Sequence, residues 1–327
     1  VCVCVCVCVC VAVSLSLCVR ARACVRARVC VTVALCLSQG AMDHVFLRCG
    51  VLAYLRAAKL GKTTGCMVTA SHNPAPDNGV KICESAGDML AAEWEPYAVE
   101  LANLESTDAV VSWAEAFAER EGFTLGVAAE VYVGMDTRAT SPHLAALVVT
   151  GVEALGGRAH NYGLLTTPQL YFFVRVRNGI DGSTCPLESS YFEQLVVAYQ
   201  MVTPHRSASK LFVDCSNGIG APKLAVLAER LSDRLEIERF NVDGSVNEGC
   251  GAEYVQKGRV LPCGVVPTAD AGKRMASMDG DADRLVYFSV EAGGGVRLVD
   301  GDKIAVLFAR FIKAQLHAAG LSDDIAL

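Results

Sequence analysis

Hydrophobic and polar positions follow two different periods along residues 41–327, and the alternation of these periods predicts a mixture of helices and strands. Apolar side chains that recur every three or four positions indicate amphipathic helices, and short apolar runs between turn residues indicate strands. On this basis we predict helices at 47–58, 94–104, 112–121, 142–155, 168–176, 191–202, 222–231 and 302–316. We predict strands at 66–70, 80–83, 127–134, 158–162, 210–214, 235–240, 274–278 and 285–290. This succession favours a mixed or parallel α/β sheet.

A polar segment divides the succession into two parts. Residues 178–187 contain two glycines, Pro186 and several polar side chains, which is typical of a linker. A chain of 327 residues is also long enough to form two domains with separate cores. We therefore predict a first α/β domain at 41–187 and a second α/β domain at 188–327.

The first forty residues differ from the rest of the chain in composition. They open with five Val-Cys pairs and continue with Arg-Ala and Ser-Leu repeats, which are the translations of dinucleotide repeats in DNA. We interpret residues 1–40 as a repeat-derived, low-complexity segment outside the native fold. An alternative interpretation is that residues 1–19 are a membrane segment, because they form an uncharged apolar run about long enough to span a bilayer. The basic region of a signal peptide, however, is missing. A metal site or disulfide framework in Cys18–Cys36 is disfavoured, because its spacing of six matches no zinc pattern.

Charge and cysteine content bear on partners and compartment. The chain carries 29 basic and 35 acidic residues, a net charge of −6. This mild acidity argues against binding to nucleic acid or to an anionic membrane, since such proteins usually present a basic face. Nine of the 16 cysteines lie in residues 1–40, and the other seven are scattered. Scattered cysteines are typical of small buried hydrophobic residues in a reducing compartment, so we predict a cytosolic (cytoplasmic) protein.

The stretch Thr-Ala-Ser-His-Asn-Pro at 69–74 is the first candidate for chemistry. An apolar strand precedes Ser71, and the turn that follows cannot continue the strand. The serine hydroxyl is therefore placed at the carboxyl end of a strand, where open α/β sheets bind ligands. His72 and Asn73 surround it with polar groups, and Lys81 adds a cation. Taken alone, the same stretch is also compatible with a solvated surface turn.

The stretch Asp-Gly-Asp-Ala-Asp-Arg at 279–284 is the second candidate. The carboxylates of Asp279, Asp281 and Asp283 can converge on one hard cation if the backbone turns tightly between them. Without a cation, three like charges in one place would be costly. A loop that leaves coordination positions free suits magnesium, which retains oxygen ligands from a phosphate. The alternative is a solvated acidic turn.

A serine hydroxyl, an acidic triad and nearby cations together suit phosphoryl transfer through a phosphoserine. The stretch at 69–74, the Asp-Asn-Gly-Val-Lys at 77–81 and the acidic stretch at 279–284 resemble the motifs of the α-D-phosphohexomutases. Softer and longer stretches resemble the phosphoacetylglucosamine mutase branch of this superfamily: 43–48, 163–170, 217–221 and 298–305. The resemblance covers essentially all of residues 41–327.

The resemblance implies roles for individual residues. Ser71 would be the phosphoserine that gives its phosphoryl group to the substrate, and Lys81 and His72 would take part in catalysis. Lys81 matches a position proposed as an acid or base, and a base at neutral pH requires a lowered pKa. One Mg²⁺ would be held by Ser71, Asp279, Asp281 and Asp283. The phosphate would be contacted by Arg284 and Asn73.

The resemblance also implies a reaction. The family interconverts N-acetylglucosamine 6-phosphate and N-acetylglucosamine 1-phosphate through a 1,6-bisphosphate, and the product feeds UDP-N-acetylglucosamine synthesis. The alternatives are a sister phosphohexomutase acting on glucose or mannose phosphates, and a non-catalytic protein that binds magnesium or sugar phosphate.

The chain departs from the family pattern in several places. The family fold has four domains, and this chain matches the first and most of the second, so the C-terminal domains are expected only in a longer protein. A Gly-Thr-Ala-Gly-x-Arg loop is absent before residue 43, where the repeat segment stands. Met135 occupies the place of an arginine, and Met278 replaces a phenylalanine of similar volume. We therefore predict little or no mutase turnover by this chain alone, because substrate positioning supplies much of the catalysis.

Overall fold

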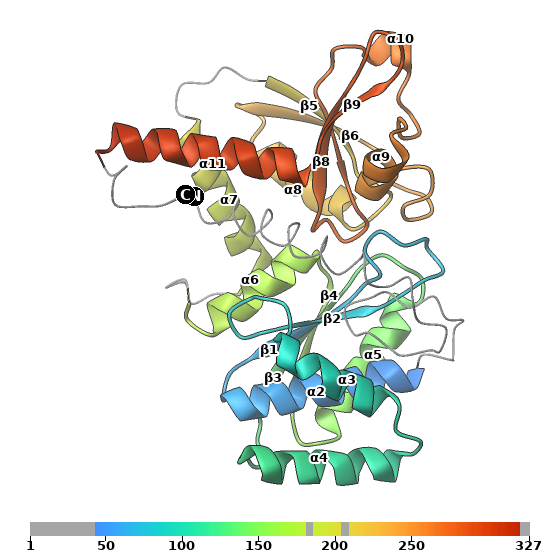
Figure 1. The fold of residues 1–327 in the computed structure, drawn as a ribbon, viewed down its shortest axis with the longest axis vertical. Helices are drawn as coiled ribbons and strands as arrows, with labels where there is room; N and C mark the ends of the chain where they lie inside the picture. The colour runs from blue at the N-terminus through green and yellow to red at the C-terminus, as the bar shows by residue number, and fades with distance from the viewer. Residues whose placement is uncertain (1–42, 181–185, 204–208, 321–327) are drawn as a thin grey trace.

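The computed structural model describes residues 43–180, 186–203 and 209–320. The predicted repeat segment at 1–40 lies outside the described residues. The described part contains two separate β-sheets, one above the other in Figure 1, each with its own helices.

The first sheet has four strands in the order β2-β1-β3-β4. Its strands are β1 (Thr64–Val68), β2 (Val80–Cys83), β3 (Glu130–Met135) and β4 (Arg158–Leu164). β1, β3 and β4 are parallel, while β2 pairs with β1 in antiparallel orientation. The carboxyl ends of β1 and β3 therefore lie at the same edge of the sheet, and the loops after them are neighbours.

Helices cover both faces of this sheet. Two of the helices on one face are α2 (Asp43–Leu60) and α5 (Ser141–Glu153). η2 (Ala92–Trp94), α3 (Glu95–Ala102) and α4 (Thr107–Glu121) complete the same hydrophobic cluster, and α6 (Thr167–Arg177) packs on the opposite face. All five residues of β1 are buried, because a strand covered on both faces has no solvent side.

The second sheet has five strands in the order β6-β5-β7-β8-β9. They are β5 (Ser209–Asp214), β6 (Leu235–Phe240), β7 (Met275–Met278), β8 (Leu285–Val290) and β9 (Val296–Val299). β6, β5 and β7 are parallel, and β8 and β9 continue the sheet in antiparallel orientation. The acidic stretch follows directly after β7, at the carboxyl edge of the parallel strands.

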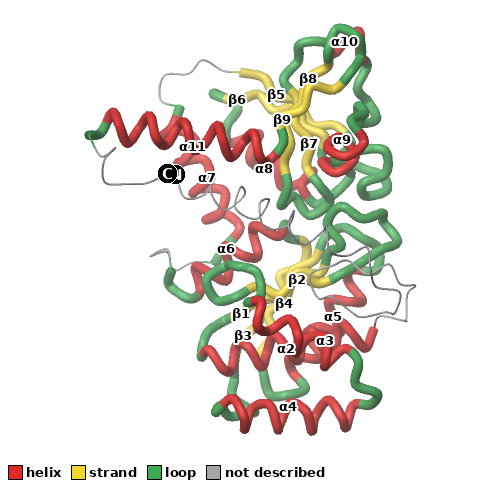
Figure 2. The backbone as a smooth tube through the Cα atoms, in the orientation of Figure 1, coloured by secondary structure: helices red, strands yellow, loops and turns green. Residues whose placement is uncertain are grey.

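The helices of the second part complete the fold (Figure 2). They are α7 (Glu188–Val202), α8 (Gly220–Arg230), α9 (Ala252–Gly258), α10 (Pro267–Asp270) and α11 (Gly301–Ala318). α7 continues the chain from α6 and contacts α8. None of the residues of α11 is buried against the described part of the chain, and Val306, Leu307 and Phe311 are exposed. No helix in the described ranges combines the length and the apolar composition that crossing a bilayer requires.

The predicted fold class is confirmed, and each predicted strand and helix is present: β2, β6 and β8 have the predicted limits, and the other elements have shifted ends. The strand predicted at 66–70 is β1, which ends at Val68 because Thr69 turns into a hydrogen-bonded loop. The helix predicted at 112–121 begins at Thr107, where the Ser106 side chain accepts a hydrogen bond from Ala109. The prediction missed α9, α10 and β9, which are short and follow glycine-rich or proline-containing segments with weak periodicity. The domain limits 41–187 and 188–327 stay predictions.

Candidate active site

The serine loop, residues 69–74, leaves β1 in a strained turn. Thr69 still donates a backbone hydrogen bond to Gly79 (2.8 Å), and Asn73 closes a turn by donating to Ala70 (3.0 Å). Between them, Ser71 has a φ of 48°, in the left-handed region that costs a non-glycine residue on the order of 1 kcal/mol or more. Ser71 is buried. The surrounding structure must therefore hold this conformation.

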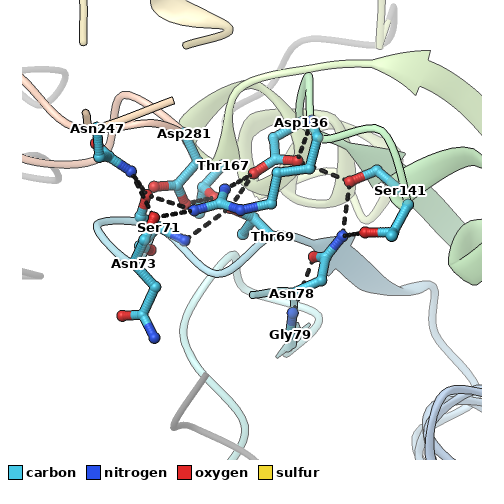
Figure 3. A network of polar contacts seen from close by, with 12 residues as sticks. Thr69, Ser71, Asn73, Asn78, Gly79, Asp136, Ser141, Thr167, Asn247 and Asp281 are labelled. Carbon is cyan, nitrogen blue, oxygen red and sulfur yellow. Dashed lines mark hydrogen bonds and ion pairs between the residues drawn. The ribbon is translucent and has the colours of Figure 1, made fainter. Parts of the chain in front are cut away.

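Polar side chains beneath the loop supply that support (Figure 3). The Ser71 amide donates to the Thr69 hydroxyl (2.9 Å), and this hydroxyl donates to Asp136 Oδ2 (2.8 Å) at the end of β3. Ser141, at the start of α5, donates to Asp136 Oδ1 (2.7 Å). Arg138 forms a fully buried ion pair with Asp136. The loop that follows β3 thus contributes a charged pair, Asp136 and Arg138, that supports the serine loop.

The metal loop, residues 279–284, brings its three carboxylates together. One ligand oxygen from each of Asp279, Asp281 and Asp283 lies within 4.8 Å of the other two. The turn is tight, because Ala282 has a φ of 57° and donates to the Asp279 carbonyl (3.1 Å). The predicted convergence of the triad is confirmed. Asp279 and Asp281 are fully buried, so the alternative of a solvated acidic turn is wrong.

Two cations compensate the triad. The Lys81 ammonium, from β2 in the first sheet, lies 2.7 Å from Asp281 Oδ2 and 2.6 Å from Asp283 Oδ2. Arg284 Nε lies 2.8 Å from Asp279 Oδ2. These two cations offset part of the negative charge of the triad. The carboxylate oxygens that they do not contact are available to bind another group.

Three buried polar atoms of the metal loop have no hydrogen-bond partner among the described residues. They are Asp281 Oδ1, Asp283 Oδ1 and Arg284 Nη2. Buried polar atoms without partners are rare in folded proteins, so such a cluster indicates a bound group. Two carboxylate oxygens accept a cation, and a guanidinium nitrogen donates to an anion.

The donor set fits a hard divalent cation. All three side chains offer oxygen, which magnesium prefers, and three ligands leave positions for water or phosphate oxygens. The Lys81 ammonium already bridges Asp281 and Asp283, as a single positive charge in the place where a cation is needed. Asp279, Asp281 and Asp283 are therefore the residues that could hold the metal.

Burial and charge shift the pKa values of several groups at the site, among them Asp283, Lys81 and His72. Burial and the charge of Asp281 raise the pKa of Asp283 to about 7. Burial alone would lower the pKa of Lys81, but the charges of Asp281 and Asp283 outweigh it and raise that pKa above its ordinary value. Lys81 is thus a cation in this arrangement, whereas the lowered pKa expected of a base is not found. Burial and the charge of Arg284 lower the pKa of His72 to about 4.

The serine loop and the metal loop meet across the two parts of the molecule. A methyl group added at Gly280 would lie 2.6 Å from the Ser71 carbonyl oxygen, so only glycine allows this approach. The Thr167 amide donates to the Asp281 carbonyl (3.2 Å), and its hydroxyl donates to the Asp281 carboxylate. Asn247 Nδ2 donates to the Ser71 carbonyl (2.8 Å). The second part of the chain thus contacts the serine backbone directly.

The remaining predicted residues lie at the edge of this arrangement. His72 Nε2 lies 3.9 Å from Glu253 Oε1, a carboxylate that Arg284 also contacts at 2.9 Å. The Asn73 side chain donates to Asp77 Oδ2 (3.1 Å), and the Asn73 backbone carbonyl accepts a hydrogen bond from Asn247 Nδ2 (3.0 Å). The predicted phosphate contact of Asn73 and the catalytic role of His72 stay predictions.

Sequence analysis missed several residues that build the site: Asp136, Arg138, Thr167, Asn247 and Glu253. One of them carried a usable signal. Thr166 and Gln169 form a capping box at the start of α6, which places Thr167 at the carboxyl edge of the first sheet. Asp136 and Arg138 are close to each other in sequence, but Asp136, Arg138 and Asn247 lie far in sequence from the serine loop and Glu253 lies far from Arg284, so no local pattern reveals these contacts.

Family models match two consecutive segments of the chain. The model described as phosphoglucomutase/phosphomannomutase, alpha/beta/alpha domain I, matches residues 46–103 and 100–184. The model described as phosphoacetylglucosamine mutase AMG1, domain II, matches residues 187–286. The first covers the serine loop and the second covers the metal loop.

Curated relatives are similar over most of the chain. Phosphoacetylglucosamine mutase from Homo sapiens is 42% identical over 294 residues, which is 88% of this chain and 54% of that protein. The Arabidopsis thaliana protein of the same name is 43% identical over 301 residues, covering 86% of this chain and 53% of that protein. The chain spans about half the length of the curated relatives it matches.

Solved structures agree with these similarities. Aspergillus fumigatus N-acetylphosphoglucosamine mutase, solved in complex with GlcNAc-6P and magnesium, has a TM-score of 0.80 and 36% identity, covering 88% of this chain and 55% of that one. An N-acetylglucosamine-phosphate mutase described as a member of the α-D-phosphohexomutase superfamily, in its substrate complex, has a TM-score of 0.79 and 33% identity. It covers 86% of this chain and 54% of the solved chain.

Proposed function

Since this chain belongs to the α-D-phosphohexomutase superfamily and, within it, to the phosphoacetylglucosamine mutase family, we propose that it carries the phosphoryl-transfer centre of such a mutase. The proposed reaction interconverts N-acetylglucosamine 6-phosphate and N-acetylglucosamine 1-phosphate. One observation carries the proposal: the partnerless oxygens of Asp281 and Asp283 and the partnerless Arg284 Nη2 lie in a loop whose Gly280 contacts the backbone of Ser71.

Ser71 is the residue that carries the phosphoryl group in this proposal. Its Oγ–P bond breaks as a bond forms between phosphorus and the 1-hydroxyl oxygen of the 6-phosphate substrate. The resulting 1,6-bisphosphate turns round, and its 6-phosphate returns to Ser71 Oγ, which regenerates the phosphoserine and releases the 1-phosphate. The serine loop suits this role because its backbone is fixed by the support beneath it.

Charged residues of the metal loop stabilise the transferred group. When bound to Asp279, Asp281 and Asp283, with Ser71 completing the set, magnesium supplies positive charge for the phosphoryl oxygens. Arg284 is held by Asp279 and Glu253 through two nitrogens, which leaves Nη2 to donate to a phosphate oxygen. We assign a second phosphate contact to Asn73.

Lys81 and His72 are assigned to proton transfer and substrate contact. Lys81 carries its proton while it bridges Asp281 and Asp283, so in this state it is a donor to the departing sugar oxygen. To accept a proton from the sugar hydroxyl, Lys81 must first move away from the two carboxylates that raise its pKa. His72 is neutral at physiological pH, because its pKa is about 4, and it offers an uncharged ring next to the serine.

The cellular setting and the domain limits belong to the same proposal. Five described cysteines, Cys49, Cys66, Cys215, Cys250 and Cys263, are free thiols, which is consistent with a reducing cytosol, where UDP-N-acetylglucosamine synthesis would use the product. The family matches end at residue 184 and resume at residue 187, close to the boundary of 41–187 and 188–327 that we propose.

Transfer of a phosphoryl group to Ser71 tests the proposal. The chain is incubated with Mg²⁺ and a hexose 1,6-bisphosphate, and the peptide that contains Ser71 is mapped by mass spectrometry. We expect one phosphate on Ser71 in the wild type and none in Ser71→Ala. An unmodified wild-type Ser71 with every bisphosphate would contradict the proposal and favour a non-catalytic sugar-phosphate-binding protein.

The same assay separates the substrate classes. N-acetylglucosamine 1,6-bisphosphate, glucose 1,6-bisphosphate and mannose 1,6-bisphosphate are each added at equal concentration to separate samples of the protein, and the initial rates of Ser71 labelling are compared. Fastest labelling by the N-acetylglucosamine compound supports the proposed substrate. Fastest labelling by the glucose or mannose compound would assign the chain to a sister phosphohexomutase.

A further inference from the structure

Two side chains from different parts of the molecule bind the same two carbonyl oxygens of the serine loop. Asn247 Nδ2 donates to the carbonyls of Ser71 (2.8 Å) and Asn73 (3.0 Å). Arg138 Nη2 donates to the same carbonyls, at 3.3 Å and 2.7 Å respectively. Asn247 therefore makes the shorter bond to the carbonyl of the serine, and Arg138 makes the shorter bond to that of Asn73.

Each donor is held rigidly by its own part of the chain. Arg138 is fully buried in its ion pair with Asp136. Asn247 has a φ of 61°, a left-handed conformation that asparagine tolerates better than most residues, and its amide donates to the Ser216 carbonyl (2.9 Å). The side chains of Arg138 and Asn247 are therefore both held in place independently of the serine loop. Together they bind the two carbonyls from the two parts of the molecule.

The carbonyl of Ser71 also determines where the serine stands relative to the metal loop. Gly280 packs against this oxygen so closely that a methyl group there would lie 2.6 Å away. Ser71 itself has a left-handed backbone, which is costly for a non-glycine residue, and the two donors to its carbonyl help to hold it in this conformation. A shift of this carbonyl therefore moves the serine away from the triad.

We propose that Asn247 is a positioning residue for phosphoryl transfer: with Arg138 it clamps the Ser71 and Asn73 carbonyls and so fixes the serine against the metal loop. The inference rests on the proposed function only for its catalytic consequence. Asn247 itself touches no reacting atom. The clamp makes the geometry of the phosphoserine depend on the second part of the chain, because removal of Asn247 leaves the Ser71 carbonyl with the longer Arg138 bond alone.

Asn247→Asp tests the clamp, because it keeps the side-chain shape but replaces the donor by a carboxylate that repels both carbonyls. Asn217→Asp is the matched control: Asn217 also has a positive φ (54°), but its side chain donates within the second part, to the Ser245 carbonyl (3.1 Å). Hydrogen–deuterium exchange of residues 69–78 is measured for both variants, and Ser71 labelling by glucose 1,6-bisphosphate is followed at saturating and at low donor concentrations.

The clamp predicts a change in the first part of the molecule from a substitution in the second. We expect Asn247→Asp to speed exchange in residues 69–78 by about tenfold and to slow labelling at saturating donor by about 100-fold, the cost of a misplaced reacting group. The donor concentration for half-maximal rate should change little. Asn217→Asp should match the wild type in both measurements.

Equal exchange in Asn247→Asp and the wild type would overturn the inference. If the aspartate unfolds the second part, Asn247→Ala removes the donor without adding charge, and the same comparison applies. If wild-type Ser71 is never labelled, the proposed function fails, but the exchange comparison still decides whether the clamp holds the loop. Faster exchange with unchanged labelling would overturn the catalytic consequence.

Discussion

The serine loop and the metal loop lie at the carboxyl edges of two similar sheets, yet they are stabilised in opposite ways. The serine loop is held from outside: its amide and carbonyls are bound by Thr69, Arg138 and Asn247, and its support, the Asp136–Arg138 pair, is complete in charge. The metal loop concentrates three carboxylates within 4.8 Å and leaves buried oxygens without partners.

Because of this difference, substitutions in the two loops should affect different properties, stability in one and ligand binding in the other. The backbone of the serine loop has its donors and acceptors within the described part of the chain, so a substitution beneath the loop should destabilise the fold. The metal loop retains unbalanced charge, which is the condition for strong binding of a cation, so a substitution in it should change binding more than stability.

Breaking the charged pair beneath the serine loop should give the largest loss of stability. Arg138→Met leaves the fully buried Asp136 carboxylate without its counter-charge, and we expect a loss of about 3–5 kcal/mol in the free energy of unfolding. Urea denaturation measures it. Arg177→Met is the control, since it breaks the more exposed pair with Glu130 and should cost less than about 1 kcal/mol. Equal losses in the two variants would remove the contrast.

Neutralising the metal loop should instead remove a response to metal. Saturating Mg²⁺, at about 100 times its dissociation constant, should stabilise the wild type by about 2.7 kcal/mol. Asp283→Asn should lose most of this gain while its stability in a chelator stays within about 1 kcal/mol of wild type, because it also relieves repulsion. Asp270→Asn, at a partly buried pair with Lys273 outside the metal loop, is the control and should keep the full response. A full response in Asp283→Asn would show that the ion binds elsewhere.

Removing the Lys81 ammonium, which bridges Asp281 and Asp283, should increase the affinity for a metal ion. The Lys81 ammonium occupies Asp281 Oδ2 and Asp283 Oδ2, so an incoming ion must displace it. We expect Lys81→Met to bind Mn²⁺ about tenfold more tightly than wild type, a gain of about 1.4 kcal/mol, measured by titration calorimetry. Lys62→Met replaces a lysine that precedes β1, away from the triad, and should leave the affinity unchanged. Weaker binding in Lys81→Met would mean that the lysine assists the ion.

An effect as small as that of Lys81→Met is expected from pH. The pKa of Asp283 is raised to about 7 by burial and by Asp281, so its carboxylate is mostly protonated at pH 6 and mostly charged at pH 8. The metal binds the charged form, and the proton must leave on binding, so affinity should fall as pH falls. We expect about a tenfold weaker Mg²⁺ affinity at pH 6 than at pH 8 for a single such group. An affinity independent of pH in this range would show that Asp283 is not a ligand.

Local pattern predicted the elements and the chemistry of each loop. The alternation of apolar runs with helical periods indicated both sheets, because a buried strand and an amphipathic helix impose their own spacing on the sequence. The triad was visible because its three carboxylates stand two residues apart, so one tight turn is enough to bring them together. The serine was visible because a turn interrupts a buried strand directly after it. These features depend on neighbours in sequence.

The surroundings of the two loops followed no local rule. Lys81 reaches Asp281 and Asp283 from 200 and 202 residues away. The sequence indicated that Lys81 is a cation near the serine. Whether its pKa is raised or lowered depends on how close the ammonium lies to the carboxylates that follow the other sheet, and the sequence does not show that distance. Arg284 was expected at the phosphoserine, and its two bound nitrogens are fixed by Asp279 and Glu253.

Hydrophobic spacing and turn chemistry were enough to predict two α/β sheets, a serine at the end of one and an acidic triad at the end of the other, because both act over a few residues. Only the tertiary structure decided that the two loops face each other, that Gly280 permits their contact, and that Arg138 and Asn247 hold the Ser71 carbonyl from both sides. The physical reason is distance: hydrogen bonds and charge pairs act over a few ångströms in space, and the chain separation of their partners leaves no trace in any local pattern.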